Sequence, residues 1–268
     1  MTRPRSSSGQ LSLALEEPAA ARRPVATDRW SVPMAPGGGG APFDDPGWFF
    51  EPWWPGTPAT IVMADDGMRL LGQLGDPLVA FPELGVVPGQ LRARSAVVPG
   101  TLLVLDAEGR PDAGALQRRL VDPADRVGVG AFIAADLLEH DGELLVDEPF
   151  GVRRARLLEV VVDGDRFLAS RGLHGEGVTL ARAAASMGVE GVSARRLAAG
   201  WRPGVTPDAW LRLPVEGVSS PVTRPLLVLL QRLPLDSIAG TGRPGSGGAW
   251  TGTSTVPRSG GHGSIVLR

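Results

Sequence analysis

The chain has 268 residues, of which 43% are hydrophobic and 21% are charged, and these proportions are typical of a globular protein with a sizeable core. It has no cysteine, which excludes disulfides, thiolate metal sites and cysteine nucleophiles, and no apolar run approaches the ~18 residues of a membrane helix. The formal net charge is −2, and all 27 basic residues are arginine, so covalent chemistry through a lysine amine is excluded.

We predict that residues 1–32 form a disordered leader, because they are rich in Arg, Ser, Ala and Pro and show no sustained apolar period. The apolar residues of Leu11–Leu15 are interrupted by Ser12 and followed by acids, unlike the hydrophobic centre of a signal peptide. A cytoplasmic location without a membrane partner is therefore expected. After the leader, the glycines at 37–40 and the residues Asp44–Pro46 predict a flexible segment.

The next stretch, Trp48–Ala59, gathers aromatic residues, prolines and a glycine around the carboxylate of Glu51. It is followed by Asp65-Asp66-Gly67, which lies between two short apolar runs and predicts a β-hairpin. Farther along, the mainly apolar run Val127–Ala135 predicts a buried strand.

Two capping residues predict helices. Asp112 is a good N-cap for a helix that carries Leu116 and Leu120 on its buried side. Thr179 is the predicted N-cap of another helix, which should end near Gly188 because glycine readily adopts the left-handed conformation of a helix end.

Several blocks between residues 33 and 214 resemble, in the same order, the adenylation domain of ATP-dependent DNA ligases, particularly the bacterial type that acts in DNA end joining. Trp48–Ala59 is similar to the family's nucleotide-binding motif, aromatic-Glu-x-Lys-x-Asp-Gly. Phe81–Leu84, Glu190–Arg196 and Ala209–Pro214 are similar to three further family blocks. The resemblance implies an α+β fold, built mainly of antiparallel sheets with a few helices. It also implies ATP and Mg²⁺ as cofactors and a role in DNA repair and recombination.

At four positions, the resemblance places a residue that lacks the family's functional group. The nucleophilic lysine falls on Trp53, whose indole has an N–H donor and no usable lone pair. The nucleotide-contacting arginine falls on Gln73, the metal- and nucleotide-binding glutamate on Thr101, and the adenine-packing phenylalanine on Ala135. Lysine adenylation, in which a neutral amine attacks the α-phosphate of ATP, is therefore not expected at Trp53.

Other family positions keep a charged residue. Glu190 stands at a metal-ligand position, although a structural, hydrogen-bonded role is favoured because its partner carboxylate is absent. Arg195 and Arg212 stand at phosphate-clamping lysine positions, where they could bind an anion or pair with acids of the core. Trp53 and Trp54 are expected to fill the space of the nucleotide rather than to stack on a ligand. The predicted degenerate nucleotide pocket, with no catalytic residue and no metal site, comprises Glu51, Trp53, Gln73, Thr101, Ala135, Glu190, Arg195 and Arg212.

The resemblance divides the chain into a leader at 1–32, an adenylation-like domain at 33–215 and a tail at 216–268. The family usually continues into an OB-fold domain, but the tail has one apolar segment, Pro225–Ile238, and a glycine-rich end, which are too few strands for a barrel. From Trp48 to Val215 there are 17 arginines against 22 acids, a net charge of −5. A domain that grips DNA usually has a basic footprint, which this core lacks, although local basic patches remain compatible with DNA binding.

Three functions fit these observations. The favoured prediction is a catalytically inactive relative of DNA ligases that serves as a nucleotide- or protein-binding module. In the protein-binding form, its support is the acidic core and the paired tryptophans. A retained ATP or AMP sensor would instead use Glu190, Arg195 and Arg212. The remaining alternative is an active DNA ligase that joins DNA ends with a different nucleophile.

Overall fold

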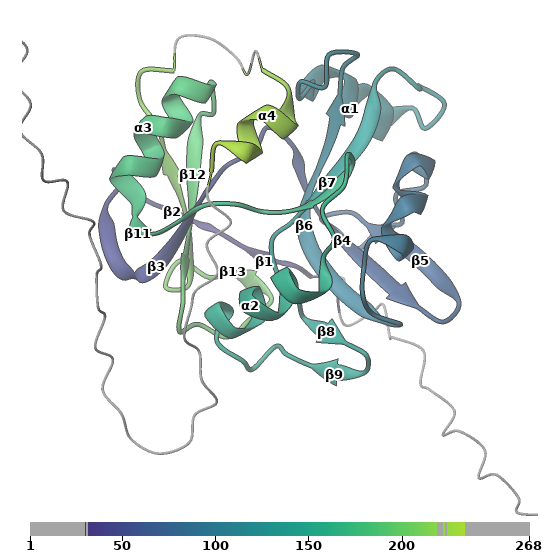
Figure 1. Ribbon diagram of the computed structural model, residues 1–268, viewed down its shortest axis with the longest axis horizontal. Helices are drawn as coiled ribbons and strands as arrows, with labels where there is room; N and C mark the ends of the chain where they lie inside the picture. The colour runs from purple at the N-terminus through teal and green to yellow at the C-terminus, as the bar shows by residue number, and fades with distance from the viewer. Residues whose placement is uncertain (1–29, 31, 219–221, 223, 234–268) are drawn as a thin grey trace, which may run out of the picture. The chain divides into compact units, whose positions relative to one another are not determined.

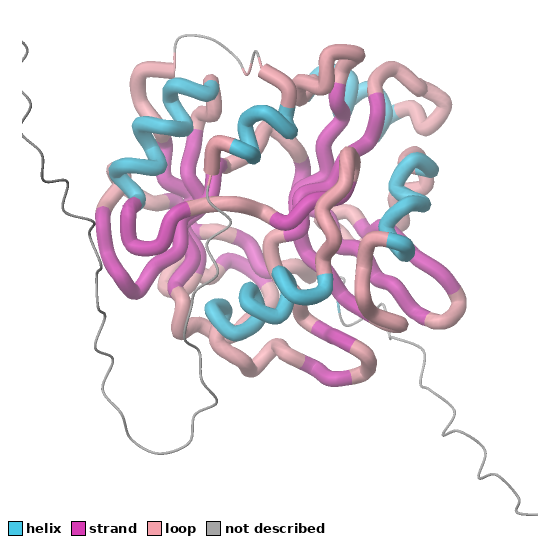
Figure 2. The backbone as a smooth tube through the Cα atoms, in the orientation of Figure 1, coloured by secondary structure: helices cyan, strands magenta, loops and turns pink. Residues whose placement is uncertain are grey.

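The computed structural model describes residue 30, residues 32–218, residue 222 and residues 224–233, and all of them belong to one compact unit (Figure 1). Most of the predicted leader and the glycine-rich tail therefore lie outside the described residues. Strands dominate the described part, and helices pack on their faces (Figure 2). No helix in this part is long and apolar enough to cross a membrane.

The larger sheet has seven strands within the described residues. Its main path runs β10-β7-β6-β4-β5, and the short strands β8 and β9 extend it from β6. All neighbours are antiparallel except β10 and β7. The bounds are β4 Thr57–Ala64, β5 Gly67–Leu71, β6 Ala96–Leu105, β7 Val129–Ala134, β8 Glu139–His140, β9 Glu143–Leu144 and β10 Phe167–Ala169.

The smaller sheet has five strands in the order β11-β3-β12-β14-β2, and only β14 and β2 run parallel. A separate parallel pair joins β1 to β13. The bounds are β1 Met34–Ala35, β2 Gly37–Gly38, β3 Asp44–Pro52, β11 Leu173–Glu176, β12 Gly191–Arg196, β13 Gly204–Val205 and β14 Trp210–Pro214. Mixed, mainly antiparallel sheets with few helices confirm the predicted α+β class, and the described strands form no closed barrel.

Helices cover both sheets. They are the 3₁₀ helix η2 Pro82–Gly89 and the α-helices α1 Ala113–Val121, α2 Phe150–Val160, α3 Gly177–Met187 and α4 Leu226–Gln231. One core packs η2, α1 and α2 against one face of the seven-stranded sheet. A second core packs α3 against the five-stranded sheet and reaches the other face of β6 and β7.

Helix α4 belongs to the second core, where it lies between the two groups of strands (Figure 1). Leu226, Leu229 and Leu230 are each at most 1% exposed, and the Leu226 amide donates to the Gly109 carbonyl at 2.8 Å. The packed unit therefore extends beyond residue 215, into the segment predicted to follow the domain.

Several local predictions are confirmed. Asp65-Asp66 turns β4 into β5 with Ala64 opposite Gly67, as expected for the hairpin. The Asp112 side chain accepts from the Ala115 amide at 2.8 Å and caps α1, whose Leu116 is buried. Helix α3 ends at Gly188, which has the left-handed φ of 79°.

Other predictions are wrong. Helix α3 begins at Gly177, before Thr179, because the Asp44 side chain reaches across from β3 and accepts from the Val178 amide at 2.9 Å. The segment expected to be flexible forms β2 and the start of β3, since β14 and β11 supply hydrogen-bond partners. Trp30, placed in the disordered leader, is 3% exposed and packs edge-to-face on Trp201 at 5.7 Å between ring centroids.

Candidate functional site

A single face of the five-stranded sheet carries most of the predicted pocket residues. Antiparallel pairing places Ser193 opposite both Glu51 and Arg212, and Arg195 opposite Trp210. Because paired residues point to the same side of a sheet, these side chains share a face. The face meets β6 and β7 of the other sheet around a cavity of about 40 Å³.

The cavity brings together five of the eight predicted pocket residues, and the lining residues also include several that the sequence did not single out. The predicted residues that line it are Glu51, Trp53, Thr101, Ala135 and Arg195. The added ones include Trp54, Ser170, Ser193 and Trp210.

Three predicted residues lie away from the cavity. Gln73 is exposed in the turn that follows β5. Glu190 is exposed just before β12, where its backbone carbonyl accepts from the Val215 amide at 3.0 Å. Arg212 is exposed on the same sheet face, with its guanidinium carbon 4.9 Å from the centroid of a Trp53 ring.

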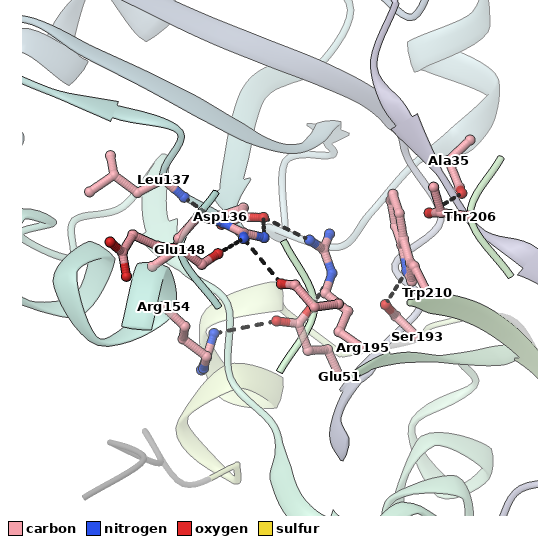
Figure 3. A network of polar contacts seen from close by, with 12 residues as sticks. Ala35, Glu51, Asp136, Leu137, Glu148, Arg154, Ser193, Arg195, Thr206 and Trp210 are labelled. Atoms are coloured by element: carbon pink, nitrogen blue, oxygen red, sulfur yellow. Dashed lines mark hydrogen bonds and ion pairs between the residues drawn. The ribbon is translucent and has the colours of Figure 1, made fainter. Parts of the chain in front are cut away.

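A buried cluster of charges adjoins the cavity (Figure 3). Asp136, with no exposed surface, accepts from Arg153 Nε and Nη2 at 2.8 Å each, which is a bidentate pair. Glu51 is 3.3 Å from Arg154 Nη1, and Arg154 also donates to the Ser170 carbonyl at 2.9 Å. Both carboxylates are thus engaged by arginines of α2.

Arg195 is the third arginine of this cluster and holds the longest contacts. Its Nη1 lies 3.4 Å from Asp136 Oδ2, and its Nε lies 4.0 Å from Glu51 Oε2. Its guanidinium carbon is 4.1 Å from the centroid of a Trp210 ring, and Trp210 Nε1 donates to Ser193 Oγ at 2.8 Å. Although Arg195 is only 8% exposed, its Nε has no hydrogen-bond partner among the described residues.

The role of Arg153 and Arg154 was missed in the sequence, where they read only as part of a helix. Both are at most 1% exposed, and Arg154 also lies over Phe49 with its guanidinium carbon 3.9 Å from the ring centroid. The available signal was two adjacent arginines before Leu157 and Val160, which α2 also buries. Buried arginines require buried acceptors, and the sequence does not show which acids supply them.

The cavity does not fit a nucleotide. One water needs about 10–15 Å³ of such space, so about 40 Å³ holds about three waters and not a base, a ribose and phosphates. Trp54, which lines the cavity, is 3% exposed and packs into the second core. Space that a ligand would need is therefore filled by the protein.

The residues present do not fit a magnesium ion either. Mg²⁺ prefers carboxylate oxygens, but Glu51 is paired with Arg154 and Glu190 lies outside the cavity. Within the described residues, no group of three or more His, Asp or Glu side chains could hold a metal ion.

Comparison with known proteins places this geometry in context. No family model matches the chain. It is 28% identical over 167 residues to the multifunctional non-homologous end joining protein LigD of Mycolicibacterium smegmatis and 32% identical over 173 residues to that of Pseudomonas aeruginosa. Each match covers 62% of this chain, but the chain spans only 21% and 20% of those relatives.

Solved structures agree with the sequence matches. A mycobacterial DNA ligase D complexed with ATP and MES has a TM-score of 0.58 and 26% identity, covering 68% of this chain and 60% of that one. The ligase domain of M. tuberculosis LigD gives the same TM-score and identity, covering 68% and 58% of the two chains.

Proposed function

The chain contains an adenylation domain of the ATP-dependent DNA ligase family, of the bacterial end-joining type, and from this premise we propose that the domain has lost adenylation chemistry and serves as a protein-binding module in DNA repair. The observation that carries the proposal is the filled cavity beside Trp53. The proposal concerns this domain, because the relatives are about five times longer than the matched segment.

The missing nucleophile supports the loss of chemistry. Adenylation needs a neutral amine, and arginine stays protonated while an indole has no usable lone pair. The chain has no lysine that could replace the group at Trp53. Rescue by a neighbouring lysine is therefore excluded.

The state of the remaining charged groups supports the same proposal. Glu51 lies at its motif position, but it is 4% exposed and its carboxylate is held by Arg154. A carboxylate already engaged by a buried arginine has little capacity left for a ligand. The fold thus keeps these groups as internal ion pairs.

Labelling with ATP tests the loss of chemistry. The full chain, incubated with α-labelled ATP and magnesium, should give no labelled band, whereas the mycobacterial ligase domain serves as the positive control. The Trp53→Lys variant should also stay unlabelled, because Pro55, Thr101 and the filled cavity remain. A band from the natural chain would support the alternative of an active ligase with another nucleophile. A band from Trp53→Lys would contradict the account of a closed pocket.

The sensor alternative has a separate test. ATP is bound in the mycobacterial structure, and Arg195 still lines the cavity here. Calorimetry with millimolar ATP should show no binding if the cavity is too small. Partner binding is tested by mixing the chain with the products of neighbouring genes, such as an end-binding protein, and looking for a shared peak in size-exclusion chromatography.

A further inference from the structure

Two buried hydrogen-bond donors beside the cavity have no acceptor within the described residues. One is Nε of Arg195, and the other is Nε1 of Trp54. Both residues line the cavity, and they are 8% and 3% exposed. Buried donors that lack acceptors are costly, so such a pair marks a place where a ligand atom or water completes the bonding.

The acceptors nearest to Arg195 are already in use. Asp136 receives two bonds of 2.8 Å from Arg153, which leaves Arg195 a contact of 3.4 Å. Glu51 is closer to Arg154, at 3.3 Å, than to Arg195, at 4.0 Å. Arg195 therefore brings a positive charge to the cavity that its neighbours satisfy only in part.

The rest of the lining favours an acceptor as well. Thr101, Ser170 and Ser193 contribute hydroxyl groups, which can donate. Ser193 Oγ already accepts from Trp210 Nε1 at 2.8 Å, so its own proton is available to an acceptor. No cavity-lining side chain described in the structure has a buried acceptor without a partner.

We propose that this cavity binds a small inorganic oxyanion, such as phosphate, through Arg195, Trp54 and the lining hydroxyls. A cation would meet unsatisfied donors, and a nucleotide exceeds a cavity of about 40 Å³. A small tetrahedral anion has oxygens on all sides and can serve several donors at once. The inference rests on the proposed function only in requiring that the nucleotide no longer fits.

Phosphate binding to the full chain tests the site. Calorimetry at constant ionic strength, with chloride as the background anion, should give saturable binding of inorganic phosphate. Arg195→Gln should weaken that binding about 10-fold or more, because a hydrogen bond to a charged group is lost together with the charge. The variant should still fold, since Arg153 and Arg154 each keep a carboxylate partner.

Two further variants make the result specific. Trp54→Phe keeps the aromatic bulk and removes the indole donor, so it should weaken phosphate binding about 3- to 10-fold. Arg212→Gln is the matched control, because Arg212 lies on the same sheet face but is exposed and does not line the cavity, and its binding should be unchanged. If Arg195→Gln fails to fold, the comparison of Trp54→Phe with Arg212→Gln decides.

The outcomes separate the two proposals. Absence of saturable phosphate binding, or equal binding by all variants, overturns the anion site and leaves the loss of adenylation untouched. Competition by AMP as effective as that by phosphate would overturn the exclusion of nucleotides on which both proposals rely. Phosphate binding without AMP competition supports both.

Discussion

Replacing Asp136 by asparagine tests whether the buried charge cluster stabilises the domain. Asp136 has no exposed surface and accepts from Arg153 at two 2.8 Å contacts, from Arg195 at 3.4 Å and from the Leu137 amide at 2.8 Å. Asparagine keeps the shape but removes the charge and turns one acceptor into a donor. Arg153 and Arg195 would then share the cluster with Glu51 as its only described carboxylate.

The expected loss is large. Removing one partner of a buried ion pair costs about 3–5 kcal/mol, against a total stability of about 5–15 kcal/mol for typical domains. With a urea dependence of about 1–3 kcal/mol per molar, the unfolding midpoint should fall by about 1–3 M. Urea unfolding of the full chain, followed by tryptophan fluorescence, measures this shift.

Two controls define the interpretation. Asp208→Asn breaks an ion pair with Arg202 whose side chains are 67% and 58% exposed, and its midpoint should stay near that of the natural chain. The double variant Asp136→Asn/Arg195→Gln should recover part of the loss, because it removes one of the two orphaned guanidinium groups. A shift for Asp136→Asn no larger than that of Asp208→Asn would refute the reasoning.

Further predictions concern the seven-stranded sheet and its cover. Burial opposes ionisation of Glu83, but hydrogen bonds from the protein, including those of the Gly130 amide and the Arg119 guanidinium, hold its pKa below the usual value. The stability advantage over Glu83→Gln should therefore be full at neutral pH and vanish as the pH falls through this lowered pKa, whereas a pH-independent difference in urea midpoints would contradict the ion pair. Gly100→Ala should cost about 1–3 kcal/mol, because its Cβ would lie 2.2 Å from the Ile133 carbonyl oxygen. Its control, Gly85→Ala, meets nothing within 4 Å, and thermal melts that rank the two glycine variants equally would refute the packing argument.

Local features of the fold could be predicted from the sequence where their cause is local. The Asp112 cap uses an amide only three residues away, and Gly188 ends α3 through its own backbone conformation. The hairpin at Asp66 is likewise closed by neighbouring residues. In each case, the group that stabilises the feature stands beside it in the chain.

Features that depend on distant partners were missed. The cap of α3 comes from Asp44, 134 residues earlier than the amide that it accepts from. Gly37 and Gly38 form a strand only because β14 lies beside them. Glu190 and Gln73 stand at family motif positions, but the cavity does not include them, since its walls are set by how the two sheets meet.

The candidate site was predictable in its losses more than in its replacement. The sequence alone shows that Trp53, Thr101 and Ala135 cannot supply the family's functional groups. It does not show that Arg153 and Arg154 occupy both buried carboxylates, which depends on α2 facing β3 and the segment after β7.

The way these carboxylates are used bears on whether the domain depends on a ligand for its stability. A pocket built to receive a charged nucleotide needs charged groups that remain available until the ligand arrives. Here Glu51 and Asp136 are already bound by arginines of the same chain, and Trp54 fills the core beside them. The one charged donor left over, Nε of Arg195, adjoins a cavity with room for about three waters. The domain can therefore fold without a nucleotide, and the only ligand that its remaining cavity favours is a small anion.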